Sequence, residues 1–333
     1  MTRRYRGSFI TANPPVPAGS TEISTAGGIW SMAYQAQYRQ AGLWPIAGVS
    51  GDGTFAIFAL GRNTTTRSKY TYASCVATSA TASTSSSSGG SAAGNTVFGI
   101  FALGSCTTTR NKYTYTGDVV SSATAASIGS SVGAAAGNST VGLFSLGANS
   151  SNVGTNTRNL YTYAGDTSTA FNSGFSSKYQ SATGNASVGV FAVGDLGPCY
   201  CGVTAARFKY LYAYGLLAGA TAATCSSSRG AAAGNSTVGI FALGSVPFVG
   251  DVTTRNKYTY ATDVVTTATA ATAAGCFPSA AGNSTRGIFS RGGCTSSTDR
   301  YTYSNDTVAA GGALTGGTRF GSAASNGIAN VNT

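Results

Sequence analysis

The chain has 333 residues, of which 9% are charged, against about 25% in an average globular protein. Its 20 Lys and Arg outnumber 9 acids, Glu22 is the only Glu, and His is absent. The lack of imidazole excludes a Ser-His-Asp or Cys-His nucleophile and a His-ligated zinc, and the few scattered acids argue against a glycosidase with paired carboxylates. We therefore expect a protein that is not an enzyme and that needs no cofactor.

Export and membrane signals are not evident in the sequence. No apolar run reaches the length of about 18 residues that a membrane span needs. The basic start lacks the apolar stretch of a secretory signal. Seven Cys, an odd number, favour folding in a reducing cytosol over a disulfide framework. A disulfide between Cys225 and Cys276 is left open, and Cys199-x-Cys201 lacks the second close pair that a thiolate zinc site needs, so we expect no metal.

Residues 1–45 form the first predicted unit, a Pro-rich arm followed by a short helix. Ser31 is the candidate N-cap of a helix over residues 32–41, which Gly42 ends. Two interpretations stay open, a plug that caps the following domain and a segment that docks on a larger particle. The candidate docking residues are Arg3, Arg4, Trp30, Tyr34, Tyr38 and Trp44.

From residue 46 to residue 333 the sequence repeats. The runs Gly-Ile-Phe-Ala-Leu-Gly and Thr-Arg-Asn-Lys-Tyr-Thr-Tyr follow each other within 99–115 and again within 239–260. A marker Phe recurs six times, at spacings of 43, 43, 47, 50 and 48 residues. The six markers are Phe58, Phe101, Phe144, Phe191, Phe241 and Phe289.

Each repeat predicts four short strands. A small apolar piece comes first, then an uninterrupted apolar run that suits a strand buried on both faces. An alternating Arg-x-Lys-Tyr-Thr-Tyr piece and a β-branched piece follow, and Gly-Asn and Gly-Asp pairs predict turns with positive φ. Four strands in 43 to 50 residues is the period of a propeller blade. We predict an all-β propeller of six four-stranded blades, with seven blades as the weaker alternative.

Closure of the ring has two candidate segments. Residues 47–52 precede the first apolar run, and residues 321–326 end the last repeat. A strand from one terminus often completes the blade begun by the other, which removes an exposed edge. We favour the C-terminal segment.

The repeat resembles the kelch repeat, in which an apolar strand closed by a Gly pair precedes a Tyr-bearing strand. Leu-Gly mostly stands where the Gly pair would be, while Gly292-Gly293 keeps it. The resemblance implies a kelch-like β-propeller, and kelch propellers mostly bind other molecules.

The N-terminal unit carries a second resemblance. Gly-x-Trp-Ser at 28–31, a short helix with Tyr and Gln, and Ala-Gly-x-Trp-Pro at 41–45 together resemble a segment of structural proteins of tailed bacteriophages. This implies a virion protein that assembles in the host cytoplasm with other virion proteins as partners, and we expect a homo-oligomer. The favoured role is a propeller displayed on a tail fibre or baseplate for host-surface recognition. The alternatives are a capsid decoration or cement protein and, last, a carbohydrate-active enzyme.

Recurring basic residues form the first candidate binding surface. They occupy equivalent places in successive repeats, on one face of the third strand, and would form a belt that attracts a polyanion such as a host-surface glycan. The alternative is a solvated outer strand whose charges prevent edge-to-edge pairing. We expect no specific nucleic acid, because the Tyr of this strand are predicted to point inward. The belt residues are Arg67, Lys69, Arg110, Lys112, Arg158, Arg207, Lys209, Arg255 and Lys257.

Three insertions after the apolar run form the second candidate surface. They span residues 148–157, 195–206 and 245–254, in three neighbouring repeats, and symmetry places them on one rim. Variable chain on a regular scaffold is where binding specificity is usually found. Apolar residues there have no role in the repeat, and we select Leu196, Tyr200 and Phe248.

Overall fold

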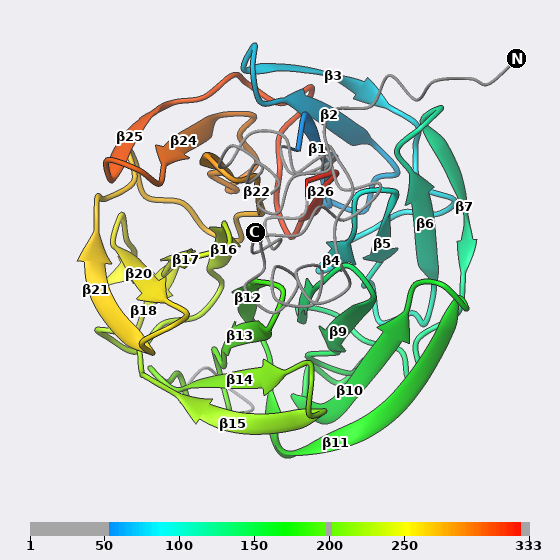
Figure 1. The fold of residues 1–333 in the computed structure, drawn as a ribbon, viewed down its shortest axis with the longest axis horizontal. Helices are drawn as coiled ribbons and strands as arrows, with labels where there is room; N and C mark the ends of the chain where they lie inside the picture. The colour runs from blue at the N-terminus through cyan, green and yellow to red at the C-terminus, as the bar shows by residue number, and fades with distance from the viewer. Residues whose placement is uncertain (1–52, 198–201, 328–333) are drawn as a thin grey trace, which may run out of the picture.

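A computed structural model describes residues 53–197 and 202–327, which form a six-bladed β-propeller (Figure 1). Each blade is a four-stranded antiparallel sheet, and the blades lie around a central axis. No helix occurs in the described ranges. The predicted fold class and the number of blades are confirmed, whereas the predicted helix over 32–41 lies outside the described residues.

The strands of the six blades, from the axis outward, are as follows. Blade 1 contains β26 (Ser322–Ser325), β1 (Phe55–Ala59), β2 (Arg67–Thr71) and β3 (Val76–Ala80). Blade 2 contains β4 (Ser91–Gly94), β5 (Phe98–Ala102), β6 (Arg110–Thr114) and β7 (Val119–Ala123). Blade 3 contains β8 (Ala134–Gly137), β9 (Val141–Ser145), β10 (Thr155–Thr162) and β11 (Thr167–Ser177).

The remaining blades follow the same order. Blade 4 contains β12 (Ser181–Gly184), β13 (Val188–Ala192), β14 (Arg207–Leu211) and β15 (Leu216–Ala220). Blade 5 contains β16 (Ala231–Gly234), β17 (Val238–Ala242), β20 (Arg255–Thr259) and β21 (Val264–Ala268), with the hairpin β18 (Ser245–Val246) and β19 (Gly250–Asp251) inserted before β20. Blade 6 contains β22 (Ala280–Gly282), β23 (Arg286–Ser290), β24 (Thr298–Thr302) and β25 (Thr307–Ala310).

The C-terminal strand closes the ring, as predicted. β26 pairs antiparallel with β1 in the register Ala56↔Ser325 to Ala59↔Ser322. The Asn326 side-chain oxygen accepts a 2.9 Å hydrogen bond from the Phe55 amide, 271 positions earlier in the chain. The two ends of the repeat region therefore share one blade.

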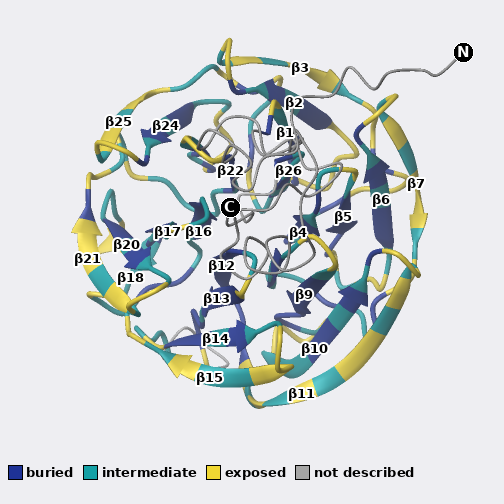
Figure 2. Ribbon diagram, viewed as in Figure 1, coloured by how far each residue is buried: buried dark blue, intermediate teal, exposed yellow. Residues whose placement is uncertain are grey.

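Burial falls from the second strand of each blade outward (Figure 2). In β5, the side chains of Ile100 and Phe101 point to opposite faces and both are fully buried. This agrees with the uninterrupted apolar run, which suits a strand with a neighbour on each face. The outer strand β7 alternates weakly and leaves Val119 half exposed. The hydrophobic core consequently lies between adjacent blades rather than at one centre.

Paired glycines hold the two inner strands of a blade around a tyrosine. Gly94 of β4 pairs with Gly99 of β5. A Cβ atom on Gly94 or Gly99 would lie within 3.1 Å or 2.9 Å, respectively, of the Tyr115 hydroxyl oxygen. The close approach of the second Tyr of the Tyr-x-Tyr motif therefore requires Gly99, and Gly94 is required as well by the Phe98 carbonyl oxygen, which would lie 2.7 Å from its Cβ.

The predicted Gly-Asn and Gly-Asp turns differ from each other. Asp118 has a φ of 54°, and the equivalent Asp of other blades also have positive φ, as predicted. Gly94 and Asn95 do not have positive φ, so the prediction for Gly-Asn is wrong. The Asn95 side-chain oxygen instead accepts hydrogen bonds from the amides of Val97 and Phe98, which closes the turn without a left-handed residue.

Candidate functional site

The arginines of the predicted basic belt are buried between blades, and the expectation that they face a polyanion is wrong for these side chains. Each is at most 4% exposed. Strand alternation correctly placed them on one face, but that face packs against the next blade. The buried arginines are Arg67, Arg110, Arg158, Arg207 and Arg255.

Arg110 shows the recurring contact. Its guanidinium carbon lies 4.6 Å from the ring centroid of Phe144, the marker Phe of the next blade. One guanidinium nitrogen donates a 2.8 Å hydrogen bond to the side-chain oxygen of Asn159, also in the next blade. Burial lowers the pKa of Arg110 to about 10. The arginine thus joins two blades through a cation–π contact and a hydrogen bond.

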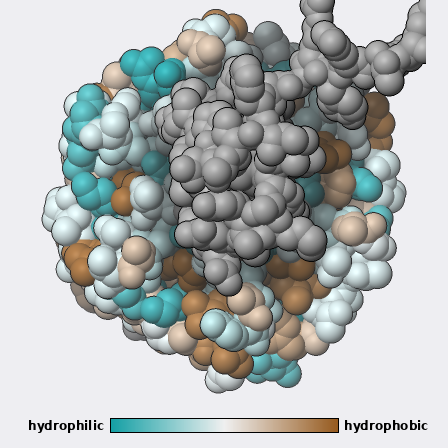
Figure 3. Space-filling model, viewed as in Figure 1, coloured by the Kyte–Doolittle hydropathy of each residue, from teal (hydrophilic) through white to brown (hydrophobic). Residues whose placement is uncertain are grey.

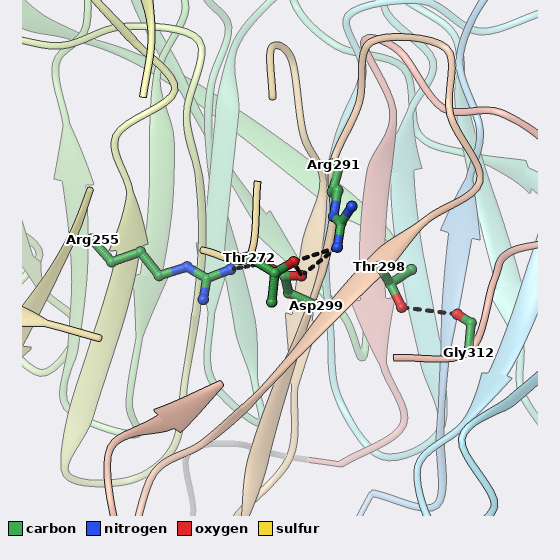
Figure 4. Close-up of polar contacts among 6 residues, drawn as sticks. All are labelled: Arg255, Thr272, Arg291, Thr298, Asp299 and Gly312. Atoms are coloured by element: carbon green, nitrogen blue, oxygen red, sulfur yellow. Dashed lines mark hydrogen bonds and ion pairs between the residues drawn. The ribbon is translucent and has the colours of Figure 1, made fainter. Parts of the chain in front are cut away.

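Asp299 replaces this Asn at the contact between blades 5 and 6. The Asp299 carboxylate forms one ion pair with Arg255 of blade 5, at 3.0 Å, and a second with Arg291 of its own blade, at 3.2 Å (Figure 4). Arg255 and Asp299 are both 1% exposed. In blade 6 Thr298 stands at the arginine position, and its hydroxyl donates to the Gly312 carbonyl oxygen (Figure 4).

The blade 3–4 contact departs from the repeat. Phe208 stands where the other blades have a polar residue, and its ring stacks on Phe191 at 4.7 Å. Arg158 is therefore displaced from Phe191, and its guanidinium carbon lies 5.5 Å from Phe208 and 5.4 Å from Phe175. Phe175 belongs to β11, which has 11 residues where most outer strands have 5. The longer strand packs its aromatic side chains over blade 4.

The lysines of the belt are partly exposed but already have partners. The Lys209 ammonium forms an ion pair with the Asp263 carboxylate of the next blade at 2.7 Å, and the Lys257 ammonium lies 3.9 Å from the Asp306 carboxylate. The ammonium groups of Lys69 and Lys112 lie 4.1 Å and 4.5 Å from the rings of Phe55 and Phe98, respectively. The belt is thus largely a set of contacts between and within blades.

The turn carboxylate of Asp263 is held ionised. Partial burial would raise its pKa, but hydrogen bonds from Lys209, the Thr221 amide and Tyr258, together with the charge of Lys209, lower the pKa to about 2. The predicted turn-capping role of this Asp series agrees with these bonds, which also join neighbouring blades through Thr221.

The central tunnel is lined by small, uncharged side chains. It encloses about 170 Å³ and is bordered by Gly, Ala, Ser and Thr of the innermost strands, with Gln180 and Pro278 as the largest side chains. None of the described residues that line it carries a charge. The described residues contain no cluster of three potential metal ligands and no helix long and apolar enough to cross a membrane. Cys225 and Cys276 are free thiols.

Three insertions lie on one face of the disc, here called the insertion face. Each joins the second and third strands of blades 3, 4 and 5, and antiparallel strands place equivalent connections at the same end. Phe248 is fully exposed in the β18–β19 hairpin, and Val249 is 72% exposed. Leu196 and Val153 are each about half exposed. The structure therefore brings Leu196 and Phe248 to this face, whereas Tyr200 and the docking residues of segment 1–45 lie outside the described residues.

An apolar groove of about 360 Å³ opens between blades 3 and 4. Phe175 of β11 forms one side, and Val193, Leu196, Phe208 and Leu217 of blade 4 form the other. Hydrophobic residues are also visible along the lower edge of the molecule, over β14 and β15, where Leu216 is 58% exposed (Figure 3). Blades 3 and 4 thus depart from the repeat and enclose an apolar groove between them.

The sequence reasoning missed an aromatic–arginine cluster at the tunnel mouth on the insertion face. Phe277 and Phe320 lie with ring centroids 3.7 Å apart, and Tyr179 lies 5.9 Å from Phe277. Arg229 and Arg319 lie over the Phe277 ring at 5.0 Å and 5.6 Å. Each aromatic residue precedes an innermost strand and has positive φ. These aromatic residues stand just before the small apolar piece of their repeats, and this shared position in the sequence could have predicted the cluster.

Comparisons with known proteins find similarity in fold. No family model and no curated protein sequence matches the chain. The structure of YjhT aligns with a TM-score of 0.57 and 9% identity, over 73% of this chain and 88% of YjhT. TolB from Acinetobacter baumannii aligns with a TM-score of 0.55 and 14% identity, over 88% of this chain and 71% of TolB. At these identities the likeness to both proteins shows the fold alone.

Proposed function

We propose that the chain is a non-enzymatic virion protein of a tailed bacteriophage, whose propeller is displayed on a tail fibre or baseplate and recognises the host surface. The N-terminal resemblance at 28–31 and 41–45 supports the virion assignment. Described cysteines that are all free fit assembly in the host cytoplasm followed by release through lysis.

The insertion face is the observation that carries the binding role. Three neighbouring blades extend the same connection, and the extension of blade 5 presents Phe248 and Val249 to solvent. Exposed large apolar side chains on extended loops are typical of contact surfaces. The partner is a macromolecular surface that offers apolar contacts, such as a host-surface glycan with exposed ring faces or a surface protein.

Copy number in purified phage particles tests the virion role. Quantitative mass spectrometry should find a few to tens of copies of the chain per particle. Hundreds of copies would instead favour the capsid decoration role. Absence of the chain from particles would reject the virion assignment.

Adsorption to host cells tests the recognition role. In particles that carry Phe248→Ser with Val249→Ser, we expect adsorption to slow by about tenfold or more, because exposed aromatic anchors dominate contact energy. The matched control is Val97→Ser. Val97 is an exposed apolar residue too, at 53%, but it lies in a turn on the face of the disc opposite the insertion face. Equal adsorption of both variants and the wild type would contradict recognition through the insertion face.

A further inference from the structure

A cation on one blade acts on an anion of the next at four of the six blade contacts, and at two of these contacts the two groups form an ion pair. The cation is the Lys of the third strand, and the anion is the Asp of the following blade's outer turn. Lys209 with Asp263, 2.7 Å apart, is the tightest of these pairs. Lys209 with Asp263 and Lys257 with Asp306 are ion pairs, while Lys69 and Lys112 act on Asp118 and Asp166, respectively, through their charge.

The contact that closes the ring replaces both partners. In blade 6, Arg300 stands at the lysine position, because it pairs with Ile288 as Lys257 pairs with Ile240. In blade 1, Cys75 stands at the aspartate position, directly before the outer strand, with a φ of 56°. A thiol therefore occupies the place that a carboxylate fills in four other blades.

Two guanidinium groups converge on this thiol. An Arg300 nitrogen lies 3.2 Å from the Cys75 sulfur, within hydrogen-bond distance. An Arg286 nitrogen lies 4.0 Å from the same sulfur and also donates a 2.8 Å hydrogen bond to the Tyr72 carbonyl oxygen. Arg286 has no counterpart in the other blades, whose second strands begin with Phe or Val. The closing contact thus holds two cations and, among the described residues, no carboxylate paired with either of them.

This surrounding favours the thiolate form of Cys75. The titratable and charged groups that face it are Arg300 from β24, Arg286 from β23 and Tyr70 from β2. Partial burial would raise the pKa of the thiol, but the hydrogen bonds from Arg300 and Tyr70 and the two arginine charges lower it below its ordinary value. Cys75 is only partly buried, so a small reagent can reach it. Low pKa and partial exposure next to cations are the conditions that make a cysteine reactive.

We propose that Cys75 is a reactive thiol of the propeller and a site of modification by low-molecular-weight disulfides. The Cys75 thiolate attacks one sulfur of the disulfide R–S–S–R, a Cys75–S–S–R bond forms, and the R–S–S–R bond breaks. The departing R–S⁻ keeps the electron pair of the broken bond and is thereby reduced, while the Cys75 sulfur is oxidised. Arg300 and Arg286 act as positioning residues that hold the sulfur as an anion.

Site-resolved labelling of the full-length chain tests this proposal. The native protein is treated briefly with isotope-coded iodoacetamide between pH 5 and pH 10, and each cysteine peptide is quantified by mass spectrometry. At pH 7 we expect Cys75 to react about threefold faster than Cys294, although Cys294 is more exposed, because a lowered thiol pKa increases the thiolate fraction by more than it reduces the nucleophilicity of the sulfur. A second reaction with oxidised glutathione should place the mixed disulfide first on Cys75.

Matched variants separate the arginine effect from a change in stability. Arg300→Gln should move the pH midpoint of Cys75 labelling up by about one unit, and Arg300→Lys should restore most of the shift. The control Lys257→Gln removes the equivalent cation one contact away and should leave Cys75 labelling unchanged. The proposal is overturned if wild-type Cys75 reacts more slowly than Cys294 at pH 7, or if Arg300→Gln and Lys257→Gln shift its midpoint equally.

Discussion

Single arginine residues hold neighbouring blades together in a chain with few charges. Arg110 lies over Phe144 and bonds Asn159, and Arg255 lies over Phe289 and pairs with Asp299. A desolvated cation–π contact contributes about 2 kcal/mol, and a hydrogen bond to a charged group contributes a similar amount. The buried positive charge is tolerated because the next blade supplies both an aromatic face and an oxygen acceptor.

Replacing these arginines by methionine should destabilise the propeller to different extents. Methionine keeps much of the apolar stem but loses the polar contacts. Arg110→Met should cost about 2 kcal/mol of unfolding free energy, because it removes the charged hydrogen bonds to Asn159 and Ser168, while Asn159 keeps its bonds with Ser127. Arg255→Met should cost about 4 kcal/mol, because it removes one of the two cations that pair with a buried carboxylate. Urea unfolding measures both values.

The control for Arg110→Met and Arg255→Met is Arg62→Met. Arg62 is exposed, so this variant should change the free energy of unfolding by less than about 0.5 kcal/mol. If Arg110→Met is as mild as Arg62→Met, the guanidinium contact does not hold the blades. If Arg110→Met costs as much as Arg255→Met, the buried carboxylate adds nothing.

At the scale of the strand, the sequence predicted the elements well and their neighbours poorly. Uninterrupted apolar runs identified the second strands, because a strand between two buried faces has no polar position. Alternation in the third strand placed Arg110 and Lys112 on one face, but it carries no information about what that face touches. Asn follows Arg in three of the third strands, as Asn111, Asn159 and Asn256, and this recurrence was a usable signal for a buried partner.

The irregular elements could not be predicted from the repeat. β11 extends to Ser177 because Phe171 and Phe175 find aromatic partners in Tyr210 and Phe208 of blade 4. These partners lie more than 30 residues away in sequence and become neighbours only once blades 3 and 4 pack together. The insertion face was predictable for the converse reason, since repeat symmetry alone fixes the end of the blade where an insertion emerges.

The glycine pairs of the inner strands give a test at this scale. Gly142 of β9 faces the Tyr163 hydroxyl, and a Cβ there would lie 2.8 Å from that oxygen and 3.1 Å from Ala93 of the preceding blade. Gly142→Ala should therefore cost about 2 to 3 kcal/mol through overpacking. Gly219 of β15 has open space around its would-be Cβ, so Gly219→Ala should stay within about 0.5 kcal/mol. Thermal unfolding of both variants measures the contrast, and equal midpoints would contradict the packing around Tyr163.

At the scale of the whole molecule, the ring is held by contacts between blades and by one strand that joins its ends. The core clusters each combine residues of two adjacent blades, so every blade depends on both neighbours. Blade 1 is the exception in its construction, because β26 comes from the opposite end of the chain. Such a pairing has a high entropic cost of loop closure, which is recovered only when all six blades are in place.

Removing the closing strand should therefore weaken the entire propeller rather than one blade. In a chain that ends at Gly321, Ala56 to Ala59 of β1 lose their hydrogen-bonded partners, and the buried Ala324 no longer covers the inner face. We expect the thermal midpoint to fall by about 10 °C or more, and we expect association through the bare β1 edge in light scattering. A synthetic peptide of residues 318–327 should restore the midpoint in a concentration-dependent way, because it supplies the missing strand as a ligand of the folded state. If the truncated chain stays monomeric with an unchanged thermal midpoint, the six blades hold together without β26. The β26–β1 pairing would then complete blade 1 but add little to the stability of the ring.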